Sequence, residues 1–77
     1  MKYYVLYELD KPDNSLAATW ETVTFLPTEK DLKEIGIDAA ARTNSCNARP
    51  VGIFSAEQVI DKAFITLALK SNEIPII

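Results

Sequence analysis

The sequence contains no histidine, and cysteine occurs only once, as Cys46. A structural zinc site built from Cys and His therefore cannot be assembled within one chain, and an intramolecular disulfide cannot form. A Cys–His catalytic dyad is excluded for the same reason. A glycine-rich phosphate loop is missing too, because the chain holds only two glycines. We therefore expect a protein that is not an enzyme and that uses no metal or cofactor.

Long apolar runs are also missing. No segment approaches the roughly 18 consecutive apolar residues that a membrane-spanning helix needs. The apolar opening is interrupted by Glu8 and Asp10, so it is too short for the core of a secretion signal. A single cysteine suits a reducing compartment. These features predict a cytoplasmic protein that does not enter a membrane.

The chain is short and mildly acidic. Eleven acidic and eight basic residues give a net charge of −3, which argues against non-specific binding to nucleic acid or to anionic lipid. Its 77 residues predict one domain, residues 1–77. A domain of this size buries only about 60% of its unfolded surface, so its core is marginal. Because metals and disulfides are excluded, self-association or a bound partner is the remaining source of stability.

The strand patterns predict an α+β fold with a three-stranded sheet. Residues 2–9 are apolar on both alternating faces, which is typical of a central strand. The turn-rich residues 11–15 connect them to a second strand at 18–26, forming an antiparallel hairpin. A short apolar run at 51–54 predicts a third strand. If the crossover from the second strand is right-handed, the third strand can lie beside the first, which gives the sheet order 2-1-3 with the doubly apolar strand in the middle.

Helix signals lie between the second and third strands and after the third. Thr28 and Asp31 form a capping-box pattern, and Gly36 predicts the end of a short helix. A further helical turn is expected at 37–42, and a long helix at 55–71. The predicted order is β-β-α-β-α, with one extra helical turn and with the helices on one face of the sheet.

The predicted helix at 55–71 is apolar on two opposite sides. One stripe consists of Ala56, Val59, Ile60, Ala63, Phe64 and Leu67. Ile65 and Leu69 lie opposite that stripe, and the apolar tail Ile74–Ile77 follows. The tail could cover these two residues or add an edge strand. Alternatively, they form a contact surface for another copy or another protein. The predicted interaction residues are Ile65, Leu69, Ile74, Ile76, Ile77 and Trp20.

The polar segment 43–50 is predicted to be a loop, and it is bracketed by Arg42 and Arg49. Two guanidinium groups around hydroxyl and amide side chains could hold a phosphate or a carboxylate. The alternative is a solvated connector. Cys46 lies within this loop, but it has no histidine to act as its base.

Aromatic residues of the first two strands offer a third possible site. Tyr3, Tyr7 and Trp20 could stack single-stranded bases. Stacking platforms of that kind are interleaved with cations, and here only Lys2 and Lys11 are near. Ordinary cross-strand packing is therefore the preferred interpretation.

Taken together, these features predict a small protein-interaction module. We expect a regulator or inhibitor, of the kind carried by viruses or mobile elements, that occupies the surface of a partner protein. Self-association as a homodimer is part of this hypothesis. The alternatives are an anion-binding or ligand-binding domain that uses Arg42 and Arg49, and a single-stranded nucleic-acid binder that uses the strand aromatics.

Overall fold

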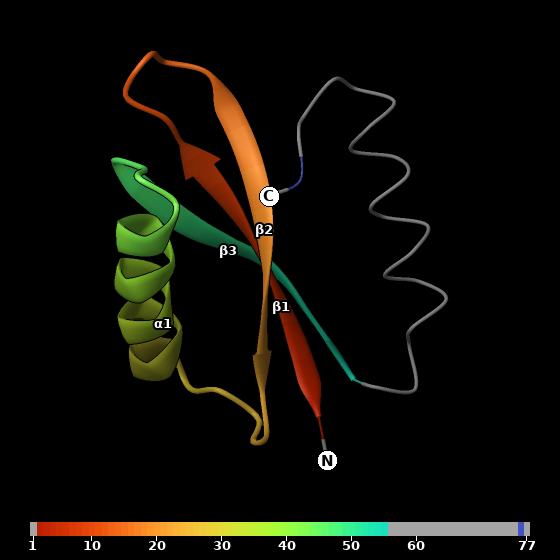
Figure 1. Cartoon of the computed structure of the whole chain (residues 1–77). Helices are drawn as coiled ribbons and strands as arrows, with labels where there is room; N and C mark the ends of the chain where they lie inside the picture. Colours follow the sequence, from red (N-terminus) through yellow and green to blue (C-terminus); the bar gives the residue numbers. More distant parts are fainter. Residues whose placement is uncertain (1, 56–75, 77) are drawn as a thin grey trace.

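A computed structural model describes residues 2–55 and residue 76. Its elements are β1 (Tyr3–Asp10), β2 (Leu16–Val23), α1 (Glu29–Arg42) and β3 (Asn47–Ser55). Within the described residues, the three strands form one antiparallel sheet in the order β2-β1-β3, and α1 covers one of its faces (Figure 1). The predicted α+β class and the 2-1-3 order are confirmed. Beyond Ser55, the predicted second helix lies outside the described residues.

β1 is the central strand because apolar side chains occupy both of its faces. Val5, Tyr7 and Leu9 face α1, and each is 0% exposed. Leu6 points to the opposite face, where only 3% of it is exposed. Leu6 pairs with Trp20 of β2, so both side chains lie on the face away from α1.

The hairpin between β1 and β2 forms where the turn residues predicted it. Asn14 has a φ of 67°, in the left-handed region that asparagine tolerates. Its N–H donates to the Lys11 carbonyl at 3.0 Å, and the Lys11 N–H donates to the Ser15 carbonyl at 3.0 Å. β2 ends at Val23, three residues earlier than predicted, and leaves Phe25 and Leu26 exposed ahead of α1.

The capping box at the start of α1 is confirmed. The Thr28 hydroxyl accepts a hydrogen bond from the Asp31 N–H at 3.3 Å. In return, the Asp31 carboxylate accepts one from the Thr28 N–H at 2.9 Å. These two bonds satisfy backbone donors that a helix start otherwise leaves unpaired. They also hold the pKa of Asp31 below its usual value.

The prediction that Gly36 ends this helix was wrong. α1 continues through Gly36 to Arg42 as one helix of 14 residues, and Gly36 lies buried in its interior. The chain leaves the helix at Asn44, whose φ is 52°. The Ser45 N–H donates to the Ala40 carbonyl at 2.8 Å, as in the Schellman arrangement that commonly ends helices. Asn44 thus occupies the left-handed position after the last helical turn that was predicted for Gly36.

The predicted 43–50 loop is too long, because β3 begins at Asn47 rather than at 51. Asn47 pairs with Asp10, and Arg49 pairs with Glu8, so the polar first half of β3 belongs to the sheet. The register shifts between Leu6 and Tyr7, which leaves Val51 as an extra residue in β3. Such a bulge bends a strand and increases its twist.

The described part of the tail lies beside β2. Ile76 forms an isolated parallel bridge with Ala18, and it is half-buried. This pairing agrees with the alternative that the tail adds an edge strand. The predicted interaction residues Ile65, Leu69, Ile74 and Ile77 lie outside the described residues. No helix in the described part of the chain is long and apolar enough to cross a membrane.

Candidate functional site

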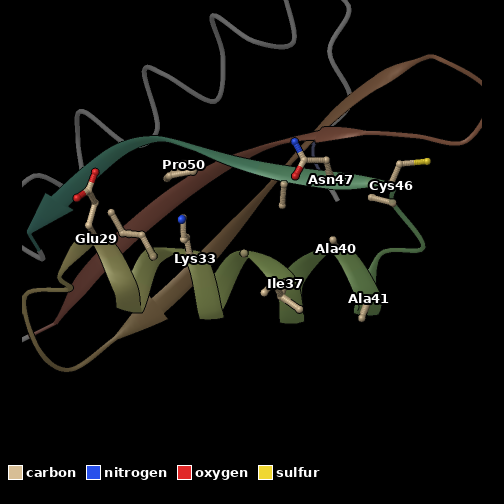
Figure 2. A pocket seen from close by; sticks show the side chains of 12 residues that line it. Glu29, Lys33, Ile37, Ala40, Ala41, Cys46, Asn47 and Pro50 are labelled. Atoms are coloured by element: carbon tan, nitrogen blue, oxygen red, sulfur yellow. The ribbon is translucent and has the colours of Figure 1, made fainter.

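An open groove of about 630 Å³ runs between α1 and β3. Its apolar lining includes Leu32, Gly36 and Ala40 from the helix and Ala48 and Pro50 from the strand. We call this feature the α1–β3 groove. Figure 2 shows it from close by, with Glu29 and Lys33 pointing from α1 toward β3. Its volume falls in the range of pockets that hold small molecules or a few side chains.

Small residues allow the helix and the strand to approach each other at the groove. A Cβ atom added to Gly36 would lie 3.1 Å from Cε1 of Tyr7 and 3.2 Å from the carbonyl oxygen of Ala48. Both distances are shorter than ordinary van der Waals contact. Together with Ala40 and Ala48, Gly36 therefore sets the depth and width of the groove.

The outer rim of the groove combines an apolar side chain with two opposite charges. Ile37 is 72% exposed, the largest exposed fraction among the big apolar residues described. Glu29 and Lys33 are spaced i, i+4, so they lie on the same side of α1. Within the described residues, neither of them forms an ion pair. The rim therefore presents two charged side chains that form no ion pair in the described structure, next to an exposed isoleucine.

The other end of the groove is polar. Cys46 and Asn47 line it, and the Cys46 N–H donates to the Asp10 carbonyl at 2.7 Å. The Cys46 side chain is exposed. The groove as a whole is an apolar channel with a polar group at each end, which suits the binding of apolar side chains.

The outer edge of β3 is not a simple template for another strand. In the described part of the sheet, β3 pairs only with β1. Pro50, which has no N–H to donate, and the extra residue Val51 lie in the middle of β3. Both features are known to discourage strand addition at a sheet edge. A partner at this surface would therefore contact side chains of the groove rather than extend the sheet.

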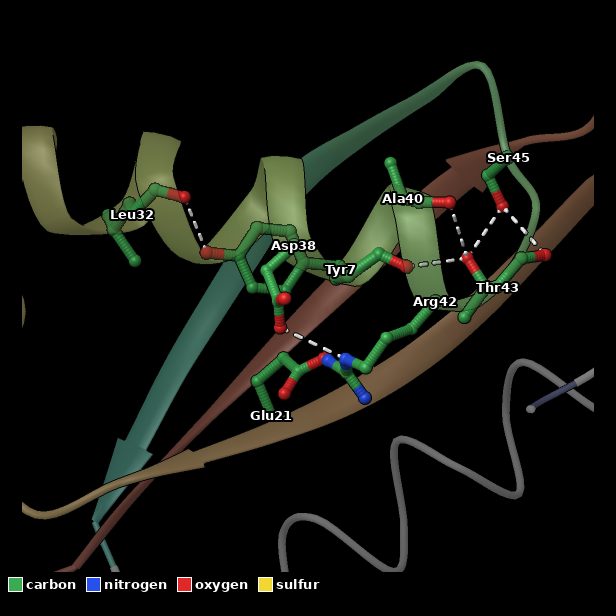
Figure 3. A network of polar contacts seen from close by, with 9 residues as sticks. Tyr7, Glu21, Leu32, Asp38, Ala40, Arg42, Thr43 and Ser45 are labelled. Carbon is green, nitrogen blue, oxygen red and sulfur yellow. Dashed lines mark hydrogen bonds and ion pairs between the residues drawn. The ribbon is translucent and has the colours of Figure 1, made fainter.

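Arg42, a predicted anion ligand, is paired with carboxylates on the α1 face of the sheet. Its guanidinium contacts Glu21 of β2 and donates to Asp38, one helical turn earlier, at 3.0 Å (Figure 3). The Arg42 side chain is about half exposed. It ties the end of α1 to β2.

Arg49, the second predicted anion ligand, lies on the opposite side of the sheet. It contacts Glu8 and Asp10 of β1, and these hydrogen bonds raise its pKa above the usual value for arginine. The structure therefore does not bring Arg42 and Arg49 together. Anion binding through both arginines stays a prediction, and an anion would have to displace carboxylates from each of them.

The aromatic residues also divide between the two faces. Tyr7 is fully buried under α1, and its hydroxyl donates to the Leu32 carbonyl at 2.7 Å (Figure 3). Trp20 lies on the other face, with its ring 5.9 Å from that of Phe54 in an edge-to-face arrangement. Tyr7 and Trp20 therefore do not share a surface on which bases could stack.

Sequence reasoning missed the α1–β3 groove, because the predicted break at Gly36 removed the helix that lines it. The available signal was the small residues at 36, 40 and 41, which are spaced to lie on one side of a helix near the apolar Ile37. Within the described residues, no group of three His, Cys, Asp or Glu side chains is placed to hold a metal ion.

Comparison with known proteins gives no further guide to this site. The chain matches no protein-family model, no curated protein and no solved structure.

Proposed function

We propose that this protein is a small interaction module that binds another protein chain through the α1–β3 groove. The observation that carries the proposal is the exposure of Ile37 beside an open apolar channel of about 630 Å³. An exposed apolar side chain next to an apolar groove is typical of contact surfaces between proteins. The binding would act by occupying the partner's surface, in the manner of a regulator or an inhibitor.

The make-up of the groove supports binding rather than catalysis. Its ionisable side chains are Glu29 and Lys33 at one end and Cys46 at the other. General acid–base chemistry needs groups in hydrogen-bonding reach of one reacting centre. Here small apolar residues separate the two ends. Shape and apolar contact are therefore the properties that the groove offers to a partner.

The single cysteine provides a direct test, because Cys46 lines the groove and its side chain is exposed. A photoactivatable benzophenone attached to Cys46 is irradiated in extract of the source organism. We expect a cross-link to a protein that mass spectrometry identifies. The purified partner should then form a stoichiometric complex with the unlabelled chain.

Two variants make this test specific to the groove. Ile37→Asp places a charge on the rim and should reduce the cross-link roughly tenfold, the loss expected when an interface anchor is removed. Leu16→Asp is the matched control, since Leu16 is exposed but begins β2 and does not line the groove. Equal cross-linking by the two variants, with both folded by circular dichroism, would contradict the proposal.

The proposed compartment is the cytoplasm. A single cysteine cannot form a disulfide within the chain, which agrees with a reducing compartment.

A further inference from the structure

We infer that the partner chain at the α1–β3 groove is a second copy of this protein, related to the first by a two-fold axis. The inference rests on the proposed function, because it assigns a partner to the same surface. In this arrangement the two α1 helices lie antiparallel, and each contacts the rim of the other copy's groove between Glu29 and Ile37. A two-fold interface requires a surface that complements itself, so that each contact occurs twice.

The charges on the groove rim meet this requirement. Glu29 and Lys33 carry opposite charges, and neither forms an ion pair within the described residues. When two copies of a helix run antiparallel about residue 31, Glu29 of one faces Lys33 of the other, and the reverse pair forms at the same time. One register therefore gives two ion pairs between Glu29 and Lys33, one on each side of the two-fold axis. A parallel arrangement would place like charges together.

Exposed apolar residues lie at both ends of the region that this register matches. Ile37 and Leu26 are the two most exposed large apolar side chains of the described residues, at 72% and 64%. Ile37 lies six residues after residue 31, and Leu26 lies five residues before it. The antiparallel register that pairs the charges matches Ile37 with position 25, and the exposed Phe25 and Leu26 both precede Glu29, where α1 begins. We expect this exposed apolar segment to lie near Ile37 of the second copy. The charges therefore set the register, and the exposed apolar side chains supply surface that the contact would bury.

The outer edge of β3 is poorly suited to pairing with another strand, which favours contact through the helices. Pro50 and the bulge at Val51 discourage pairing between the β3 strands of two copies. Association through α1 leaves that edge as it is. It also covers apolar surface in a chain whose small size leaves it a marginal core.

The contact between the two copies is short, so the dimer should be weak. The matched region extends from residue 25 to residue 37, about 13 residues in each copy, whereas a standard-sized interface uses about 20–30 residues a side. Exposed ion pairs set the register more than the affinity. Association should therefore depend on concentration. It should also depend on both the ion pairs of Glu29 with Lys33 and the apolar contact of Ile37.

The test measures the mass of the full chain in solution by sedimentation equilibrium. We expect a mass that rises from one chain toward two between about 10 μM and 1 mM. Ile37→Asp should remain a monomer over that range. Lys33→Glu and Glu29→Lys should each weaken the dimer by about tenfold or more, because each creates two repulsive pairs.

Mixing the two charge variants distinguishes this interface from a loss of folding. The groove rim of Glu29→Lys carries two positive charges, and that of Lys33→Glu carries two negative charges. An equimolar mixture should therefore form a heterodimer while each variant alone stays monomeric. The double variant E29K/K33E should recover the self-association of the native chain. Lys30→Glu and Glu34→Lys are matched controls on the same helix, do not line the α1–β3 groove, and should leave the mass unchanged.

Several outcomes would overturn the inference. A native chain that stays monomeric at 1 mM, a dimer that persists in Ile37→Asp, or a mixture without heterodimer would each do so. A monomer that still cross-links from Cys46 to another protein would reject the second copy and keep the proposed function. A dimer whose cross-links join only copies of this chain would support the inference and reject a foreign partner.

Discussion

The aromatic ring of Tyr7 lies directly beneath Gly36, at a distance that leaves no room for a side chain on the helix. A Cβ atom at residue 36 would come within 3.1 Å of Cε1 of Tyr7. Tyr7 is fully buried, and its hydroxyl is bonded to the Leu32 carbonyl one turn before Gly36. The ring is therefore held in place from two directions. This contact brings α1 onto the sheet at Gly36, which itself lines the groove.

Gly36→Ala should destabilise the protein, although alanine favours helix over glycine by about 1 kcal/mol. The added methyl group would press on the Tyr7 ring and on the Ala48 carbonyl of β3. Because the ring is anchored and the carbonyl belongs to a strand, we expect a net loss of about 1–3 kcal/mol. Urea unfolding measures this loss. Glu34→Ala, an exposed substitution in the same helix, is the control, and a more stable Gly36→Ala would show that the contact is looser than described.

Tyr7→Phe should lower the free energy of unfolding by about 1 kcal/mol at neutral pH, because it removes the hydrogen bond to Leu32. Burial raises the pKa of Tyr7 above its usual value of about 10. The neutral phenol therefore contributes stability below pH 10, and that contribution is lost as the pH rises through the raised pKa. Unfolding of both proteins across alkaline pH checks this. The difference in free energy of unfolding between the native chain and Tyr7→Phe should shrink as the pH rises. A difference that stays constant would contradict the raised pKa of Tyr7.

Asp31→Asn should make the protein less sensitive to acid. Hydrogen bonds from Thr28 lower the pKa of Asp31, so the ionised carboxylate contributes stability above the usual aspartate pKa of about 3.9. That contribution is lost as the pH falls through the lowered pKa. The native chain should therefore be more stable than the variant at pH 7, and the two should converge in acid. Thermal unfolding from pH 7 to pH 2 measures the convergence, with Glu34→Gln as a control that makes no capping contact.

Arg49→Met should lower the unfolding temperature at low salt, because it leaves Glu8 and Asp10 beside each other without their shared cation. The methionine side chain keeps much of the apolar stem of arginine. In 1 M NaCl, where screening acts over about 3 Å, the difference from the native chain should narrow. Lys30→Met, which removes an exposed charge without an ion pair in the described structure, should show little change at either salt concentration. A salt-independent loss would mean that packing, rather than charge, dominates at Arg49.

Local sequence signals predicted several parts of the fold correctly. The apolar residues on both faces of β1 predicted its central position, and Asn14 predicted the turn. The Thr28–Asp31 pattern predicted the start of α1. Each of these signals depends on a few neighbouring residues and on backbone geometry that they control themselves.

The candidate site could not be predicted in this way. At Gly36, the local preference for a helix end competes with packing of α1 against Tyr7, which lies 29 residues earlier. At 47–50, polar residues resemble a loop until their pairing with β1 is known. The groove arises from both of these long-range contacts, and its one local signal, the small residues of α1 near Ile37, is not enough to predict it.

The sequence by itself determined the order of the strands, because a strand that is apolar on both faces must lie between two others. It also determined the hairpin turn and the beginning of the helix, since hydrogen bonds among adjacent residues form them. Only the tertiary structure decided that α1 passes through Gly36 and that Arg42 and Arg49 lie on opposite faces of the sheet. The physical reason is that both depend on contacts between distant segments, whose packing outweighs the weaker preferences of individual residues.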